Sequence, residues 1–143
     1  MSIDVRLLGP DDASLVMHVA PGVFDNEPDP ALTAEFLNDP RHHLAAAIDG
    51  DFLVGIASAV HYVHPDKPAQ LWINEVAVAP SHHNQGIAKR LLRLLIELAG
   101  ELNCTELWVL TDRANTIARR LYESVGAEAP GEDCVMYTIR LPD

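Results

Sequence analysis

The sequence has few basic residues and few cysteines for its length. Its 143 residues include 10 Lys and Arg against 21 Asp and Glu, so the formal net charge is −11. A surface this acidic repels nucleic acids and anionic membranes, which excludes both as partners. It attracts cations, although the need for solubility alone also explains such a charge. Cys104 and Cys134 form neither a disulfide framework nor a Cys-x-x-Cys pair, so we expect both to be packing residues.

Long apolar runs are also absent. No stretch is long enough to cross a membrane, and no basic segment followed by an apolar run opens the chain as in a secretion signal. We therefore expect a cytoplasmic protein. Hydrophobic residues make up 48% of the 143 positions, which is enough for a core, and we predict a single domain over residues 1–143.

Helical and extended patterns alternate along the chain, which predicts an α/β domain with a mixed central sheet flanked by helices. An Asp–Gly pair at 49–50 predicts a hairpin between two of the strands. Strands are expected over residues 3–8, 43–48, 52–63, 70–78, 107–110 and 134–141. Helices are expected from 11 or 12 to 19, and over 31–38, 85–102 and 117–125.

The most informative segment joins the strand that ends at Val78 to the longest predicted helix, through Pro80 and a small polar loop. The first turn of a helix has unpaired N–H groups and the positive end of the helix dipole, so this junction can bind an anion. It lacks the glycines of the P-loop and of the G-x-G-x-x-G dinucleotide fingerprint. Gly86 allows a pyrophosphate to approach the backbone closely; the alternative is that it only eases the turn.

These residues resemble a known family. Residues 74–80 followed by 83–88 resemble the acetyl-CoA motif of the GNAT superfamily of N-acetyltransferases, which has [Arg/Gln]-x-x-Gly-x-[Gly/Ala] at its pyrophosphate loop. His83 stands at the Arg/Gln place. Residues 115–127 resemble the second conserved segment of the family, with its Asn, its Leu–Tyr pair and its closing Gly. The order and spacing of the two segments also match, and the resemblance spans nearly the whole chain.

The resemblance implies a GNAT-like fold with a splayed central sheet, and acetyl-CoA as co-substrate. In the family, the splay opens main-chain N–H and C=O groups to the pantetheine arm, and one N–H polarises the thioester carbonyl. Valines in such a strand also fit an ordinary core, and the sequence leaves both interpretations open. The expected acetyl-CoA contacts are Val76, Ala77, Val78, His83, Asn84, Gln85, Gly86, Ile87, Ala88, Lys89, Asn115 and Ala118.

Glu75 is the first candidate for catalysis. It lies in a mostly apolar strand, where a carboxylate loses hydration and holds a proton more tightly, which suits a general base. An alkylammonium acceptor must lose a proton before its nitrogen can attack a thioester. A base at the end of this strand is therefore required, acting directly or through water. The alternative is a structural Glu paired with Arg or Lys in the sheet.

Tyr122 is the second candidate for catalysis. It shares a helical stripe with Asn115 and Ala118, so these side chains can face the same ligand. The resemblance implies that Tyr122 lies near the thioester sulfur and donates a proton to the departing thiolate. A core tyrosine with a satisfied hydroxyl is the alternative.

Fold and co-substrate do not name the acceptor. The local match is closest to the type I aminoglycoside 3-N-acetyltransferases, notably at Phe24–Asp25, Phe36–Leu37 and the 74–78 strand. Carboxylates bind the several ammonium groups of an aminoglycoside through charge-assisted hydrogen bonds. We therefore expect acetylation of the 3-amino group of a deoxystreptamine ring. The expected acceptor contacts are Asp25, Glu27, Asp112, Glu132 and Asp133, each of which also fits a solvated loop.

Two other functions stay open. One is a GNAT enzyme for a polyamine, an amino acid or a protein N-terminus; the other is a non-catalytic acyl-CoA-binding module, against which the presence of both Glu75 and Tyr122 argues. A homodimer is also left open. The seven histidines include adjacent pairs, which point apart on a strand, and His61-x-x-His64 lacks an obvious third ligand, so we predict no metal site.

Overall fold

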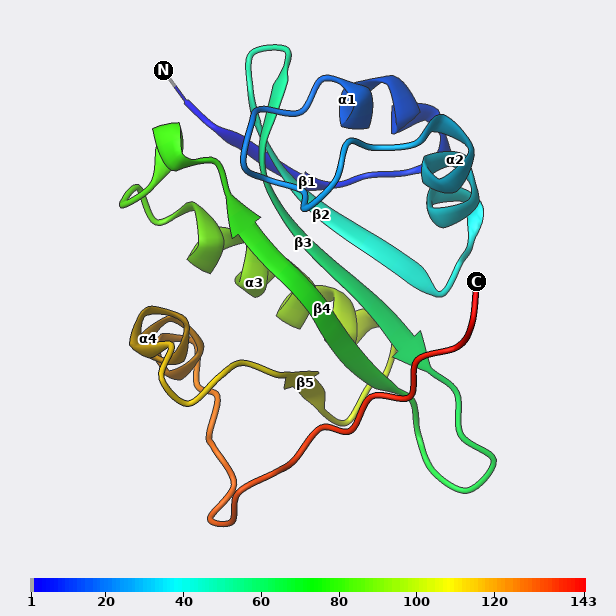
Figure 1. The fold of residues 1–143 in the computed structure, drawn as a ribbon, viewed down its shortest axis with the longest axis vertical. Helices are drawn as coiled ribbons and strands as arrows, with labels where there is room; N and C mark the ends of the chain where they lie inside the picture. The colour runs from blue at the N-terminus through cyan, green and yellow to red at the C-terminus, as the bar shows by residue number, and fades with distance from the viewer. Residues whose placement is uncertain (1) are drawn as a thin grey trace.

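The computed structural model describes residues 2–143, and the five strands found there form one sheet in the order β1-β2-β3-β4-β5 (Figure 1). The β4–β5 pair is parallel and the other three pairs are antiparallel, so the predicted mixed α/β sheet is confirmed. The strands are β1 (Asp4–Leu7), β2 (His42–Asp49), β3 (Phe52–Tyr62), β4 (Gln70–Val78) and β5 (Leu107–Val109). The helices are α1 (Ala13–Met17), α2 (Pro30–Asn38), α3 (Ile87–Glu101) and α4 (Thr116–Ser124), with 3-10 turns η1 (Pro10–Asp12) and η2 (Pro80–His82).

Helices cover both faces of the sheet. The predicted apolar stripe of α3 packs on one face, where Leu91, Leu92 and Leu95 are buried against β1 to β4. On the other face α2 contacts β2 and α1 contacts β3, burying Leu37 and Val16. Figure 1 shows α1 and α2 together at one part of the sheet and α3 running behind β4. The core therefore lies in two layers, one on each side of the central strands.

The sheet opens between β4 and β5. Their parallel pairing covers only Leu71 to Ile73 of β4, whereas β4 continues to Val78. On its other side β4 stays paired with β3, and a register shift leaves Asn74 without an opposite residue. Within residues 2–143, β4 therefore has a strand on one side only from Asn74 onward, and the predicted splay is confirmed.

Local capping explains where two helices begin. Asp29 accepts a hydrogen bond from the Leu32 N–H at 2.8 Å, and Pro30 occupies the first turn of α2. Asn115 accepts one from the Ala118 N–H at 3.1 Å at the start of α4. Both helices begin within one residue of the predicted positions, because short polar side chains compensate N–H groups that the helix itself leaves unpaired.

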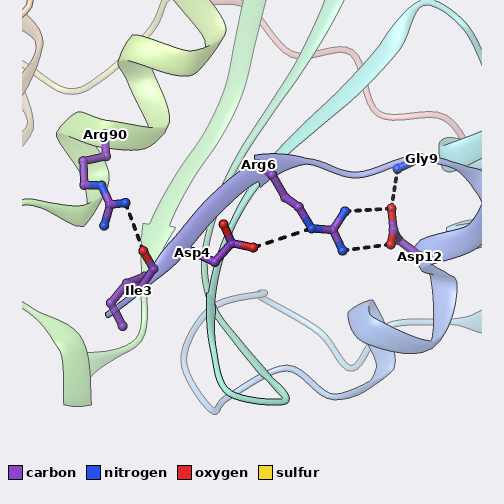
Figure 2. Close-up of polar contacts among 6 residues, drawn as sticks. All are labelled: Ile3, Asp4, Arg6, Gly9, Asp12 and Arg90. Atoms are coloured by element: carbon purple, nitrogen blue, oxygen red, sulfur yellow. Dashed lines mark hydrogen bonds and ion pairs between the residues drawn. The ribbon is translucent and has the colours of Figure 1, made fainter. Parts of the chain in front are cut away.

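A short polar network fastens the N-terminal strand (Figure 2). Arg6 donates two hydrogen bonds to the Asp12 carboxylate at 3.0 and 3.2 Å, and the Gly9 N–H donates a third at 2.7 Å. These bonds hold the pKa of the Asp12 carboxyl below its ordinary value. Arg90 of α3 reaches the Ile3 carbonyl at 3.0 Å. The network joins β1 to η1 and to α3.

The predicted strand over Cys134–Leu141 is wrong. Within the described chain, no helix or strand follows α4, and Val135, Tyr137, Ile139 and Leu141 are 72 to 89% exposed. The alternation of apolar residues is compatible with a strand, but a strand also needs a neighbour that pairs with its N–H and C=O groups. Cys134 is exposed and is not a packing residue, whereas Cys104 packs partly buried against the core.

Two further expectations differ in detail. The strand at 107–110 was expected to be buried, but β5 lies at the edge of the sheet and Trp108 is 37% exposed. The first helix is shorter than expected, because η1 precedes α1 and α1 ends at Met17. Among residues 2–143, no helix has the length and apolar character needed to cross a membrane.

Candidate functional site

The open side of β4 presents main-chain polar groups. The Ala79 N–H donates to the Val54 carbonyl of β3 at 2.8 Å, so Ala79 faces β3. Because successive residues of a strand point their N–H and C=O groups to opposite sides, Val78 and Val76 face the side that β5 leaves open. The Val78 carbonyl accepts a hydrogen bond from His83 Nε2 at 2.8 Å, which confirms its direction. These are the groups that an extended ligand with amides can pair with.

The loop before α3 leaves main-chain N–H groups at the helix start that could bind an anion. Asn84 and Gly86 have φ of 61° and 73°, which turn the chain sharply into the helix. No side chain of the described residues caps α3, and its first main-chain bond runs from the Arg90 N–H to the Gly86 carbonyl at 3.2 Å. The N–H groups of Ile87, Ala88 and Lys89 precede that bond. They lie at the positive end of the helix dipole and fit a pyrophosphate.

Two hydrogen-bond contacts of the His82 side chain hold the start of this loop. The His82 ring contacts Ser81 Oγ through Nδ1 at 2.7 Å and Asp49 Oδ2 through Nε2 at 2.8 Å. This ties η2 to the end of β2. The two neighbouring histidines thus face different surroundings, His82 toward Asp49 and His83 toward Val78.

A cavity of about 330 Å³ lies between α2 with its preceding loop and the centre of the sheet. Four carboxylates line it, those of Asp25, Glu27, Asp29 and Glu75, and none of the described lining residues is Lys or Arg. Two of the predicted acceptor contacts, Asp25 and Glu27, are therefore brought together with the predicted base. The apolar lining residues are Val16, Phe24, Pro28, Leu32, Phe36, Leu37 and Leu44.

Glu75 is not desolvated as expected. It is exposed to solvent, and it faces Ser58 across the β3–β4 pair beside the register shift at Asn74. The shift breaks the regular alternation on which the expectation of burial rested. The carboxylate therefore opens into the acidic cavity and remains hydrated there.

Tyr122 lines a different cavity, of about 520 Å³, between the end of β5, α4 and the chain that follows α4. Burial raises the pKa of its hydroxyl above the ordinary value, so the group keeps its proton at neutral pH. Glu132 and Asp133 line the same cavity, and Asp133 pairs with Arg113. These two carboxylates thus lie with Tyr122 and apart from Asp25 and Glu27.

Three other predicted contacts, Asp112, Asn115 and Ala118, have local roles in the structure. Asp112 lines neither of the two cavities, and its carbonyl accepts a hydrogen bond from the Asn115 N–H at 2.9 Å. The Asn115 side chain and the Ala118 N–H bond to each other at the start of α4. All three residues shape the turn that leads into α4, the helix that carries Tyr122.

Sequence reasoning missed three residues. Asp29 was expected only to cap α2, yet it also lines the acidic cavity. Ser58 lies there as well, and its being the one polar residue between positions 53 and 60 was an available signal. His43 pairs with His61 on the neighbouring strand, their Nε2 and Nδ1 atoms 2.8 Å apart, which depends on register and could not be predicted from spacing. Within residues 2–143, no group of three or more His, Cys, Asp or Glu residues is placed to hold a metal ion.

Comparisons with known proteins agree with this geometry. The Acetyltransferase (GNAT) family matches residues 13–127. The streptothricin acetyltransferase of Streptomyces lavendulae is 33% identical over 99 residues, which are 69% of this chain and 50% of that protein. The N-alpha-acetyltransferase RimI of Mycobacterium tuberculosis is 33% identical over 102 residues, 71% of this chain and 62% of that protein. The chain thus spans about half to three-fifths of the length of these two relatives.

Solved structures show the same fold. An aminoglycoside acetyltransferase from an uncultured soil metagenomic sample, in complex with sisomicin, superposes with a TM-score of 0.84 at 18% identity, over 98% of this chain and 97% of that one. A ribosomal-protein-alanine N-acetyltransferase from Brucella melitensis biovar Abortus superposes with a TM-score of 0.73 at 25% identity, over 98% of this chain and 100% of that one.

Proposed function

Because the chain belongs to the acetyltransferase (GNAT) family, we propose that it transfers the acetyl group of acetyl-CoA to a primary amine. The observation that carries the proposal is the open side of β4. At one end of it lies the uncapped start of α3, and on the adjoining face of the sheet Glu75 opens into a cavity lined by carboxylates. An anion-binding end and a cation-binding cavity fit the two substrates of such a transfer.

The chain's own groups fit acetyl-CoA along this side. The N–H groups at the start of α3 would bind the pyrophosphate, and the peptide groups of Val76 and Val78 would pair with the amides of the pantetheine arm. This places the thioester near the middle of β4. By the same alternation Ala77 directs its peptide groups to Ile56 of β3, so among the predicted strand contacts only Val76 and Val78 would meet the pantetheine arm, followed by the loop residues up to Lys89.

In the proposed reaction Glu75 accepts a proton from the acceptor amine, directly or through water, as the nitrogen attacks the thioester carbonyl carbon. The new C–N bond forms and the C–S bond breaks. Tyr122 donates its hydroxyl proton to the departing thiolate sulfur and recovers one from solvent. Tyr122 approaches from the β5 side, since it lines a cavity with Val109, whose partner in β4 is Ile73.

For the acceptor we propose an aminoglycoside, acetylated at the 3-amino group of its deoxystreptamine ring. The described lining of the cavity is acidic and includes neither Lys nor Arg, which supports a polycation, and a structural neighbour was solved with sisomicin. A protein N-terminus is the second candidate, because Phe24, Phe36 and Leu44 offer apolar walls for the side chain next to an amine. A role in antibiotic resistance would follow only from the first candidate.

The acceptor is tested by measuring CoA release with gentamicin, spermidine and a peptide with a free N-terminus, at saturating acetyl-CoA. We expect the highest kcat/KM for gentamicin, with mass spectrometry placing the acetyl group on the 3-amino nitrogen. Faster turnover of the peptide would favour the second candidate. Absence of acetyl-CoA binding by calorimetry would overturn the enzyme itself.

Glu75→Gln tests the base. We expect turnover to fall by about 100-fold, because general-base catalysis contributes about 10²–10⁴-fold, while the Kd for acetyl-CoA changes less than about twofold. Glu97→Gln on α3 is the matched control, since Glu97 is exposed and lines neither cavity. Equal activity of the two variants would remove the role assigned to Glu75.

A further inference from the structure

The hydrogen bond between His83 and Val78 occupies a group that the proposed acetyl-CoA site needs. His83 Nε2 donates to the Val78 carbonyl at 2.8 Å, on the side of β4 that β5 leaves open. A ring donor at this distance fills the position from which an amide N–H of a ligand would bind the same oxygen. The contact therefore lies on the side of β4 that would face the ligand and not behind the strand.

The strand geometry leaves little room for His83 and a ligand to bind the Val78 carbonyl at the same time. Val78 is the last residue of β4, and the Ala79 N–H beyond it is already bonded to Val54. On the open side, the Val78 peptide is thus the outermost main-chain acceptor that an extended ligand meets after leaving the start of α3. A carbonyl oxygen has two lone pairs, but the imidazole ring itself takes the space beside it.

His83 is free to leave this position. Its side chain is exposed; its N–H bonds to the Pro80 carbonyl at 3.4 Å and closes η2, but this bond holds the backbone and leaves the ring able to rotate. Its neighbour His82 is held by Ser81 and Asp49, so the loop can stay in place while the His83 ring rotates away. Movement of this one side chain would then free the Val78 carbonyl.

From this arrangement we infer that His83 is a gate on the open side of β4: its ring competes with the pantetheine arm for the Val78 carbonyl and must swing aside when acetyl-CoA binds. The inference rests on the proposed function. It assigns a role to the residue that stands at the Arg/Gln place of the family motif. In this role His83 limits acetyl-CoA affinity and does not contribute to it.

The test compares His83→Ala with the unchanged protein by isothermal calorimetry, using two probes. One probe is acetyl-CoA, and the other is 3′-phospho-ADP, which keeps the nucleotide and pyrophosphate but lacks the pantetheine arm. We expect His83→Ala to bind acetyl-CoA about 3–10-fold more tightly, the net effect of one hydrogen bond no longer broken on binding. Its affinity for 3′-phospho-ADP should stay within about twofold of the unchanged protein.

His82→Ala is the matched control. It loosens the same loop without clearing the Val78 carbonyl, so it should give no gain in acetyl-CoA affinity. An equal gain in both variants would attribute the effect to loop loosening and overturn the gate. Weaker acetyl-CoA binding by His83→Ala would also overturn it, since His83 would then contact the co-substrate.

A direct readout is the ring of His83 by NMR. With ¹⁵N-labelled histidine, addition of acetyl-CoA should shift the His83 Nε2 signal as its hydrogen bond to Val78 is lost, while addition of 3′-phospho-ADP should leave that bond in place. Equal acetyl-CoA affinities and an unmoved ring would refute the gate alone. Absence of acetyl-CoA binding in every variant would instead refute the proposed function.

Discussion

His43 is the residue whose protonation the fold controls most strongly. Burial, followed by the neighbouring charge of His61, lowers the pKa of its imidazole from 6.5 to about 4. The two rings stack at 5.1 Å between centroids and share a hydrogen bond across β2 and β3. Near neutral pH both rings are uncharged. The pair therefore packs between β2 and β3, at the end away from their hairpin turn, without a buried charge.

This shift predicts a loss of stability in mild acid. Below its ordinary pKa of 6.5 the unfolded chain takes up a proton at His43, whereas the folded chain does so only near pH 4. The free energy of unfolding should therefore fall as the pH drops from 6.5 to about 4. Below that pH, His43 should cause no further loss. Allowing for the partial exposure of the ring, we expect a loss of about 1–2 kcal/mol.

Urea unfolding from about pH 7 to about pH 4 measures this loss. His43→Gln keeps a donor and an acceptor for His61 but does not titrate, so it should unfold with a flatter pH dependence over the same range. His18→Gln is the control, because His18 lies on the surface at the end of α1. If His43→Gln and the unchanged protein lose stability in parallel, carboxylates and not His43 govern the window.

Among the elements, those with purely local determinants could be predicted from the sequence. The caps Asp29 and Asn115 and the apolar stripe of α3 act within one helix, and these helices appear as expected. The start of α3 lies two residues later than predicted, because Gly86 takes a left-handed conformation that ends the loop and not one that begins the helix. The apolar stripe that predicts α3 carries no information about the φ angle of Gly86.

Features that depend on two segments could not be predicted in this way. The exposure of Glu75 depends on the register shift against β3, and the separation of Glu132 from Asp25 depends on which side of the splayed sheet each loop reaches. The Cys134–Leu141 pattern likewise says nothing about a partner strand. Each site motif lies within one segment of the chain, so it could be recognised in the sequence. The positions of these motifs relative to one another could not be predicted in the same way.

The packing of α3 on the sheet gives a prediction for Gly55. A Cβ at this position would lie 3.2 Å from Ile87 Cγ2 and 3.4 Å from both Leu91 Cδ1 and the Ala47 Cβ. Gly55→Ala should therefore push the first turn of α3 from β3 and destabilise the fold by about 1–3 kcal/mol. It should also weaken acetyl-CoA binding, because that turn carries the proposed pyrophosphate site.

Gly100→Ala is the control for Gly55→Ala. It lies in the last turn of the same helix, and in the described structure a Cβ there has nothing within 4 Å. This variant should gain up to about 1 kcal/mol of stability from higher helix propensity and leave acetyl-CoA affinity unchanged. Chemical unfolding and calorimetry measure both quantities. A Gly55→Ala protein as stable as the unchanged one would show that α3 adjusts without cost.

At the scale of the whole molecule, charge and cavity favour the same class of acceptor. The chain has a net charge of −11, and every charged side chain among the described residues that line the Glu75 cavity is acidic. The field of the molecule therefore draws a cation toward the site, and the cavity carboxylates then bind it. The proposed co-substrate acetyl-CoA is an anion and would bind against this field, which would make the main-chain donors at the start of α3 more important. A homodimer stays a prediction.

Salt should separate the two candidate acceptors. Raising the ionic strength from about 0.1 M to about 1 M shortens the Debye length from about 10 Å to about 3 Å, so it removes long-range attraction. Because attraction grows with ligand charge, we expect the KM for gentamicin to rise about 10-fold and that for a peptide with one free amine less than about twofold. Initial rates are measured with acetyl-CoA kept saturating at each salt concentration.

The variant Asp25→Asn, which removes one cavity charge and keeps the shape of the side chain, should start from a higher KM for gentamicin and respond less to salt. If both acceptors respond alike, the acidic surface serves solubility and does not recruit the substrate.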